Sequence, residues 1–214
     1  MATKRVEDGV FIEGAISIVA KEGIENLRTR DVAQYAGFSE ATLFKRYPTK
    51  ENLLLNAFLY IDNKISGILL NDPYIMKPDD GFDKAIFHIW HKIYRYLIDN
   101  EDETLFLIRY RYSSLYTKEV RHMRKAYNGS FDEVYEIFEN NIGGLPNSYK
   151  GFLINYIFEL TLTFAEKVVT KKIRDIPEVE YSVRSAILAA VIEITSGQRK
   201  FGSDFIIGET EDDD

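Results

Sequence analysis

The sequence predicts an all-α protein. Apolar side chains recur at helical spacing from the start, where Phe11, Ala15 and Ile18 fall at positions i, i+4 and i+7. The five prolines lie between such segments, where helices are expected to begin or end. No run of alternating β-branched residues bounded by hairpin turns occurs. We therefore predict helices over 6–22, 29–36, 40–46, 50–70, 79–98, 101–114, 117–141, 147–172 and 179–199.

Turn-forming and capping residues separate these segments. Gly37 lies between the second and third predicted helices. Because glycine readily adopts the positive φ that a tight turn requires, we predict a turn at this position. Ser39 follows it and can cap the third helix. The segments 71–81 and 143–146 are rich in Gly, Pro, Asn and Asp and are predicted loops. The acidic end of the chain, 209–214, is predicted to be a disordered tail.

Composition excludes several kinds of site. The chain has 214 residues, of which 45% are apolar, which is enough to bury a sizeable core without covalent cross-links. It has no cysteine, so disulfides, thiolate zinc sites and cysteine nucleophiles are excluded. The first apolar stretch is interrupted by acidic residues and lacks a cleavage site, and the uncharged apolar runs are too short for a bilayer. We therefore expect a cytoplasmic protein without a membrane segment.

The net charge of −7 hides an asymmetry along the chain. Residues 1–52 carry eight basic and eight acidic side chains, whereas the tail 209–214 alone carries five acidic ones. Within the first part, residues 28–50 hold five basic and two acidic side chains, a balance of +3. The overall acidity therefore does not exclude a nucleic-acid partner.

Residues 23–53 carry the pattern that predicts function. Ala33, Gly37 and Leu43 have the spacing of a helix-turn-helix, in which the second helix enters a DNA major groove. The small core between the two helices is expected to consist of Val32, Ala36, Phe38 and Leu43. Thr29 can cap the first short helix, and Thr49 can cap the helix after the motif. The N-terminus of that following helix, with Lys50, would suit a phosphate.

Over residues 8–60 the sequence resembles the tetracycline-repressor (TetR) family of bacterial transcription regulators. The resemblance rests on Arg30-Asp31-Val32-Ala33, Ala36-Gly37-Phe38-Ser39, Thr42-Leu43-Phe44 and Tyr47-Pro48-Thr49-Lys50-Glu51-Asn52-Leu53, all in order. It implies an N-terminal three-helix DNA-binding domain over 1–50, a helical ligand-binding and dimerisation domain over 51–208, and the tail 209–214.

The resemblance also implies which residues contact DNA. By matching position, these are Arg28, Thr29, Arg30, Ser39, Glu40, Ala41, Thr42, Phe44, Lys45, Arg46, Tyr47 and Lys50. The chain departs from the family at three of them. Phe44 stands where Tyr is usual and is either core or contact, Arg28 stands where Thr or Ser is common, and Glu40 places an acid opposite a polyanion. Ser39 can also act as a helix cap only.

The body is rich in aromatic residues, which either form a helix-bundle core or in part line an apolar ligand pocket. The pocket candidates are Trp90, Tyr94, Phe106, Tyr110, Tyr127, Asn155, Phe158 and Glu159. Glu159 lies in an otherwise apolar helix, so a buried carboxylate there would need a ligand group or an Arg from another helix.

The last two predicted helices carry wide apolar faces. The family resemblance implies that they pair with their mates in a four-helix dimer interface, with intramolecular core as the alternative. The residues concerned are Phe152, Tyr156, Leu160, Phe164, Val183, Ile187, Ala190, Val191 and Ile194.

Other classes of function have little support in the sequence. It has no phosphate-binding glycine loop, no GxSxG elbow and no HExxH pair, so we predict no catalytic residues and no cofactor. His88 and His91 have a spacing that permits a shared metal, but no third ligand is evident and no metal is predicted. The sequence therefore predicts a homodimeric repressor that binds a near-palindromic operator and is released by a small apolar or aromatic ligand. The alternative is a helical protein-interaction module that does not bind DNA.

Overall fold

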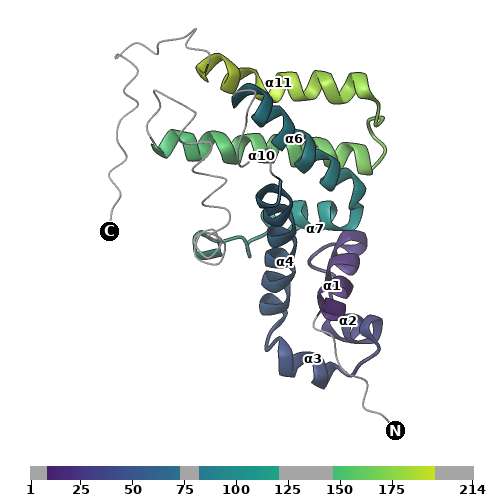
Figure 1. Ribbon diagram of the computed structural model, residues 1–214. Helices are drawn as coiled ribbons and strands as arrows, with labels where there is room; N and C mark the ends of the chain where they lie inside the picture. The colour runs from purple at the N-terminus through teal and green to yellow at the C-terminus, as the bar shows by residue number, and fades with distance from the viewer. Residues whose placement is uncertain (1–8, 73–81, 121–146, 196–214) are drawn as a thin grey trace.

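The computed structural model describes residues 9–72, 82–120 and 147–195 (Figure 1), and the described residues contain helices and no strand. The all-α prediction is confirmed. The helices are α1 (Gly9–Glu22), α2 (Thr29–Ala36), α3 (Glu40–Arg46), α4 (Lys50–Leu70), α6 (Phe82–Asp99), α7 (Glu101–Arg111), α10 (Asn147–Val169) and α11 (Pro177–Thr195). Most of the predicted 117–141 helix, the 143–146 loop and the acidic tail lie outside the described residues.

Two helices end earlier than predicted, each for a local reason. The helix predicted to reach 114 ends at Arg111, where the Ser113 hydroxyl donates to the Tyr110 carbonyl at 2.7 Å and accepts from the Leu115 N–H at 3.2 Å. The helix predicted to reach 172 ends at Val169, because Lys171 adopts a left-handed conformation (φ 60°) that stops the helix.

The molecule has a small head and a larger body. Helices α1, α2 and α3 form the head at the lower end of Figure 1, and α4 leads from it towards the body. In the body, α6 crosses α10 and α11, while α7 lies beside α1 of the head. The arrangement puts α3 at the free end of the molecule, away from the body helices.

One hydrophobic core runs through both parts. It joins Phe11 and Leu43 of the head to Phe58 of α4, Tyr110 of α7 and Leu162 of α10. A second cluster lies higher in the body, where Leu69, Ile86, Trp90, Tyr94, Ile157 and Leu188 are buried together. The head is therefore fixed to the body by shared packing as well as by the chain connection through α4.

Polar contacts reinforce the joint between head and body. The Arg109 guanidinium of α7 donates to the Val19 carbonyl of α1. Lys64 of α4 pairs with Glu103 of α7 at 2.6 Å, and the Tyr96 hydroxyl of α6 donates to the same carboxylate. Three elements of the body are thus tied together at the point where the head docks.

By length and mean hydropathy alone, α4 could cross a bilayer, although charged residues interrupt its apolar sequence. Half of its apolar window is buried inside the protein, including Leu54, Phe58 and Ile61. This burial is what a central helix of a folded domain shows, so the apolarity of α4 is explained by the core.

Candidate nucleic-acid interface

The turn between α2 and α3 has the predicted geometry. Gly37 lies in the left-handed region with φ 73° and ψ 30°. The next N–H, that of Phe38, donates to the Ala33 carbonyl at 2.9 Å, which closes the end of α2. Ser39 then accepts a hydrogen bond from the Thr42 N–H at 3.2 Å, so its predicted role as the cap of α3 is confirmed.

The core beneath this turn is also as predicted. Val32, Ala36 and Leu43 are buried, and Phe38 is partly buried against the Phe11 ring at 5.7 Å between centroids. Because these contacts fix α3 against α1 and α2, the opposite face of α3 is presented to solvent in one defined orientation.

That outward face carries the predicted DNA contacts. Glu40, Ala41, Phe44, Lys45 and Arg46 are exposed. Phe44 is 42% exposed, so of its two predicted environments the surface is the one observed. Neighbouring α2 adds Arg28 and Arg30, both exposed, at its first turn. The structure therefore gathers four cationic side chains on adjoining parts of α2 and α3.

The predicted cap of α2 is wrong. Arg28, not Thr29, occupies the N-cap position, with an extended backbone (φ −111°, ψ 131°) and no hydrogen bond from its side chain. The Thr29 hydroxyl instead donates to the Glu40 carboxylate at the start of α3. This bond joins the two helices of the motif and engages the carboxylate of Glu40, one of the predicted DNA contacts.

Tyr47 is mostly a core residue. It is 7% exposed, and its ring packs edge-on against Phe11 at 6.3 Å between centroids. Burial raises the pKa of its hydroxyl, against a smaller opposing effect of Arg46. Its ring therefore anchors the end of α3, and the predicted DNA contact has to come from the hydroxyl edge.

The start of α4 is capped as predicted, by Thr49, which accepts from the Asn52 N–H at 3.1 Å. Its suitability for a phosphate is reduced, because the Glu51 carboxylate already lies there. Hydrogen bonds from its own backbone N–H and from the Thr49 hydroxyl lower the pKa of Glu51. The Lys50 ammonium donates to the Glu25 carbonyl at 3.5 Å, so it is held against the segment between α1 and α2.

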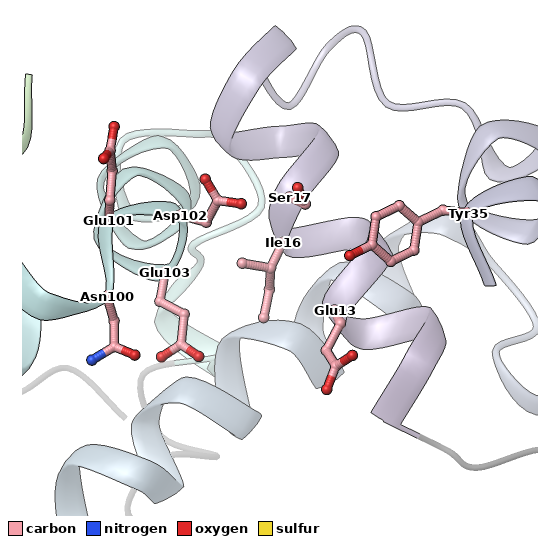
Figure 2. A pocket seen from close by; sticks show the side chains of 8 residues that line it. All are labelled: Glu13, Ile16, Ser17, Tyr35, Asn100, Glu101, Asp102 and Glu103. Atoms are coloured by element: carbon pink, nitrogen blue, oxygen red, sulfur yellow. The ribbon is translucent and has the colours of Figure 1, made fainter.

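An open pocket of about 330 Å³ lies between head and body, where α1 and α2 meet the first turn of α7 (Figure 2). Its lining residues are Glu13, Ile16, Ser17, Tyr35, Asn100, Glu101, Asp102 and Glu103. Four of these residues, Glu13, Glu101, Asp102 and Glu103, are carboxylates, so the pocket is acidic and would repel an anion. No local sequence pattern indicates this pocket, because its walls come from separate segments.

The predicted ligand residues separate into two groups in the body. Trp90 and Tyr94 are buried in the upper cluster, where the indole N–H donates to the Thr161 hydroxyl at 2.9 Å. Phe106 and Tyr110 belong to the lower core that joins head and body. Asn155 is exposed and Phe158 packs against the lower core, while Tyr127 lies outside the described residues. The buried members of the set therefore belong to two separate clusters of the described residues.

Glu159 is exposed, and of the two partners considered for its carboxylate the structure shows an Arg. Its side chain is 51% exposed and pairs with Arg111 of α7 at 2.8 Å, so an Arg from another helix is its partner. The Arg111 side chain is only 6% exposed and lies between the rings of Tyr116 and Phe158. Sequence reasoning missed Arg111, because nothing in its local pattern indicates burial.

The predicted dimer residues are mixed in character. Tyr156 is exposed and Leu160 is partly buried, whereas Phe164, Val183 and Ile187 pack against the upper cluster of the same chain. The last three therefore contribute to the intramolecular core, the alternative left open by the sequence. The side chains of Phe152, Ala190, Val191 and Ile194 lie outside the described part.

The two histidines of α6 do not share a site. His88 is 2.8 Å from Asp72 at the end of α4, and His91 is 2.6 Å from Glu180 of α11. Within the described ranges, no group of three or more metal-ligating side chains comes together. The pair joins α6 to two different neighbours.

Comparison with known proteins agrees with this geometry. Residues 11–57 match the model of the family described as bacterial regulatory proteins, tetR family. No curated protein matches the chain. Among solved structures, a putative TetR-family transcription regulator from Shewanella sp. PV-4 has a TM-score of 0.70 at 18% identity, covering 87% of this chain and 96% of that one.

Two further structures show the same fold. A TetR-family transcription regulator from Marinobacter aquaeolei VT8 has a TM-score of 0.67 at 18% identity, over 85% of this chain and 93% of that one. The transcriptional regulator FadR from Bacillus subtilis, solved in complex with stearoyl-CoA, has a TM-score of 0.63 at 15% identity, over 89% and 99%. The likeness therefore extends over head and body alike.

Proposed function

We propose that this chain, a member of the TetR family of transcription regulators, is a homodimeric repressor that binds a near-palindromic operator and is released by a small molecule. The observation that carries the proposal is the capped helix α3, whose outward face is exposed, basic and held at the free end of the head. A helix of this kind fits a major groove.

The exposed side chains divide by the DNA groups that suit them. Lys45 and Arg46 lie in the last turn of α3, and Arg28 and Arg30 lie at the start of α2, where cations reach phosphates on either side of a groove. Glu40, Ala41 and Thr42 lie in the first turn of α3, the part of a recognition helix that meets base edges. Glu40 can accept from a cytosine amino group while keeping the Thr29 hydroxyl as donor.

The dimer is proposed to form through α10 and α11. Tyr156 on α10 and Ala186 and Ala189 on α11 are exposed, and small residues on one helix face let a partner helix approach closely. Two-fold symmetry would place two α3 helices one DNA turn apart, roughly 34–36 Å, which requires two inverted half-sites.

Release by a small molecule rests on the family and on the body's aromatic interior. FadR from Bacillus subtilis was solved with stearoyl-CoA, and its fold matches this chain over head and body. For this chain, a ligand that favours a head orientation unsuited to the operator must weaken DNA binding, and DNA must weaken ligand binding by the same factor.

The test is a salt titration of binding to the DNA upstream of this chain's own gene. We expect specific binding that weakens steeply with salt. Because about 0.9 units of logarithmic slope accompany each phosphate contact, Lys45→Ala should lower the slope by about 2 in a dimer. Lys118→Ala, an exposed lysine of the body, is the matched control and should leave the slope unchanged.

Absent or salt-insensitive binding, with Arg30→Ala and Lys45→Ala changing nothing, would reject DNA binding and favour the protein-interaction module. Two features of the sequence support that alternative, the acid at Glu40 and the Phe at position 44, where the family usually has Tyr. Glu40 is engaged by Thr29, and Phe44 is exposed on the same face as the cations.

A further inference from the structure

Two buried polar atoms of the described residues have no hydrogen-bond partner, and both lie in the upper layer of the body. They are the Nε of Arg184 on α11 and the hydroxyl oxygen of Tyr94 on α6. Native structures rarely leave buried polar atoms without a hydrogen-bond partner, so each of the two needs an explanation. Arg184 is the more informative of the two, because its guanidinium carries a charge.

The guanidinium of Arg184 is held by rings rather than by acids. Its Cζ lies 4.8 Å from the centroid of the Phe87 ring on α6 and 5.2 Å from that of the neighbouring Tyr181 ring. Such contacts use the faces of the guanidinium, whereas its N–H donors lie in its plane. The Nε–H, which lies on an edge that can form bidentate bonds to carboxylate or phosphate, therefore has no acceptor among the described residues.

The acids next to Arg184 along this seam have other partners. Helices α6 and α11 run antiparallel, so that Arg95 meets Asp175 at 3.2 Å and His91 meets Glu180 at 2.6 Å. The next turn brings Phe87 opposite Arg184, with no ion pair to the described part of the chain. Along the contact between α6 and α11, two ion pairs are thus followed by Arg184, which has no ion pair among the described residues.

The position of Arg184 on α11 points it towards α6 rather than towards a partner subunit. Ser182, Ala186 and Ala189 form one exposed face of α11, and Tyr181, beside Arg184, is exposed as well. With about 100° of rotation per residue, a side chain two positions from both 182 and 186 lies on the other side of the helix. Arg184 is only partly exposed, in agreement with this direction.

Apolar side chains continue from the guanidinium into the body. Phe87, Val183 and Ile187 are partly buried and pack against the upper cluster that contains Trp90 and Tyr94. A ligand whose oxyanion lies at Arg184 would therefore place its apolar part along these side chains. We propose that Arg184 binds the oxyanion, carboxylate or phosphate, of an amphiphilic effector at the α6–α11 seam, an inference that rests on the ligand response in the proposed function.

The chain's own fluorescence can test this, because Trp90 is the single tryptophan and lies one helical turn from Phe87. The full chain, without DNA, is titrated with decanoate, decyl phosphate, decanol, decyltrimethylammonium and inorganic phosphate, all below their micelle concentrations. We expect a saturable change in Trp90 emission with the two anionic amphiphiles, at midpoints about tenfold or more below that of decanol, the ratio typical of a charge-assisted bond.

Arg184→Met should remove the preference for the anionic amphiphiles while leaving decanol binding unchanged. Arg174→Met, an exposed arginine on the connection between α10 and α11, is the matched control and should keep the preference. If Arg184→Met does not fold, Arg184→Lys takes its place and should reduce the preference, because the ammonium lacks the bidentate edge.

Equal midpoints for decanoate and decanol, a preference that survives Arg184→Met, or no response to any amphiphile would each overturn the inference. An equally strong response to inorganic phosphate would overturn the requirement for an apolar part. Operator binding is measured separately, without amphiphile, so that failure of this site and failure of DNA binding are told apart.

Discussion

The substitution Gly14→Ala tests how the head is built. Gly14 lies on the buried side of α1, where the Tyr35 ring of α2 crosses it. A Cβ at position 14 would lie 2.9 Å from Cδ1, 3.2 Å from Cγ and 3.4 Å from Cβ of Tyr35. Ordinary contact begins at about 3.5 Å, so either the ring or the whole of α2 has to move.

The expected energy follows from two opposing effects. Alanine in place of glycine favours a helix by up to about 1 kcal/mol, whereas an overpacked contact typically costs about 1–3 kcal/mol. Tyr35 is 57% exposed and its ring can swing outwards, so the cost should lie at the lower end of that range. We expect Gly14→Ala to destabilise the chain by about 0–1 kcal/mol, and to stabilise it by up to about 1 kcal/mol when Tyr35→Ala is also present.

The assay is a double-mutant cycle of urea unfolding followed by circular dichroism. Gly67→Ala is the matched control, because an added Cβ at this helical position on α4 meets nothing closer than the Asn71 side chain at 4.0 Å. It should show the gain from helix propensity alone. If Gly14→Ala stabilises as much as Gly67→Ala does, or if the coupling energy with Tyr35→Ala is near zero, the reasoning is refuted.

Three further substitutions test other contacts by the same unfolding assay. Ser39→Ala removes the cap of α3 and should cost about 1 kcal/mol; no loss would contradict the cap. Arg109→Met should lower the free energy of unfolding by only about 1 kcal/mol, because the Val19 carbonyl keeps the Gly23 N–H as donor at 3.0 Å. A loss above about 3 kcal/mol would mean that Arg109 stabilises the contact between α1 and α7 by more than one hydrogen bond. Tyr94→Phe should be neutral or stabilising by about 1 kcal/mol, because the buried Tyr94 hydroxyl has no hydrogen-bond partner among the described residues; a clear loss would reveal a partner. Burial, with the charges of nearby acids, raises the pKa of this hydroxyl to about 12, so it stays uncharged in the assay.

The helix-turn-helix was predictable because its signals are local. The left-handed turn at Gly37, the caps Ser39 and Thr49 and the burial of Leu43 depend on residues a few positions apart. The cap of α2 was mispredicted for the opposite reason. The Thr29 hydroxyl is engaged by Glu40, eleven residues away, and that contact depends on how the two helices cross.

The body was predictable only as a set of amphipathic helices. Periodicity shows which face of a helix is apolar but not which helix covers it, so Trp90 and Phe106 were grouped although they lie in different clusters. The pair of Arg111 and Glu159 spans 48 positions, and the exposure of Glu159 follows from that partner. No local sequence pattern indicates that the Nε of Arg184 is buried without a hydrogen-bond partner.

The packing also limits how the body can act on DNA. The middle of α4 is held in the lower core, where the Phe58 ring stacks on the Tyr110 ring of α7 at 4.9 Å between centroids. A movement of α4 relative to α7 would break that stack. A movement of the head that keeps the stack would therefore carry α4 and α7 together.

The other end of α4 offers the connection that such a movement needs. Leu69 lies in the upper cluster with α6, and Asp72, just beyond the helix, is held by His88 at 2.8 Å and Lys92 at 3.3 Å, both on α6. If the proposed ligand between α6 and α11 displaced α6, the contacts of Asp72 would pull on the end of α4. Because close-packed elements transmit strain rather than absorb it, a small shift at this end would change the angle at which α3 meets the groove in the proposed DNA complex.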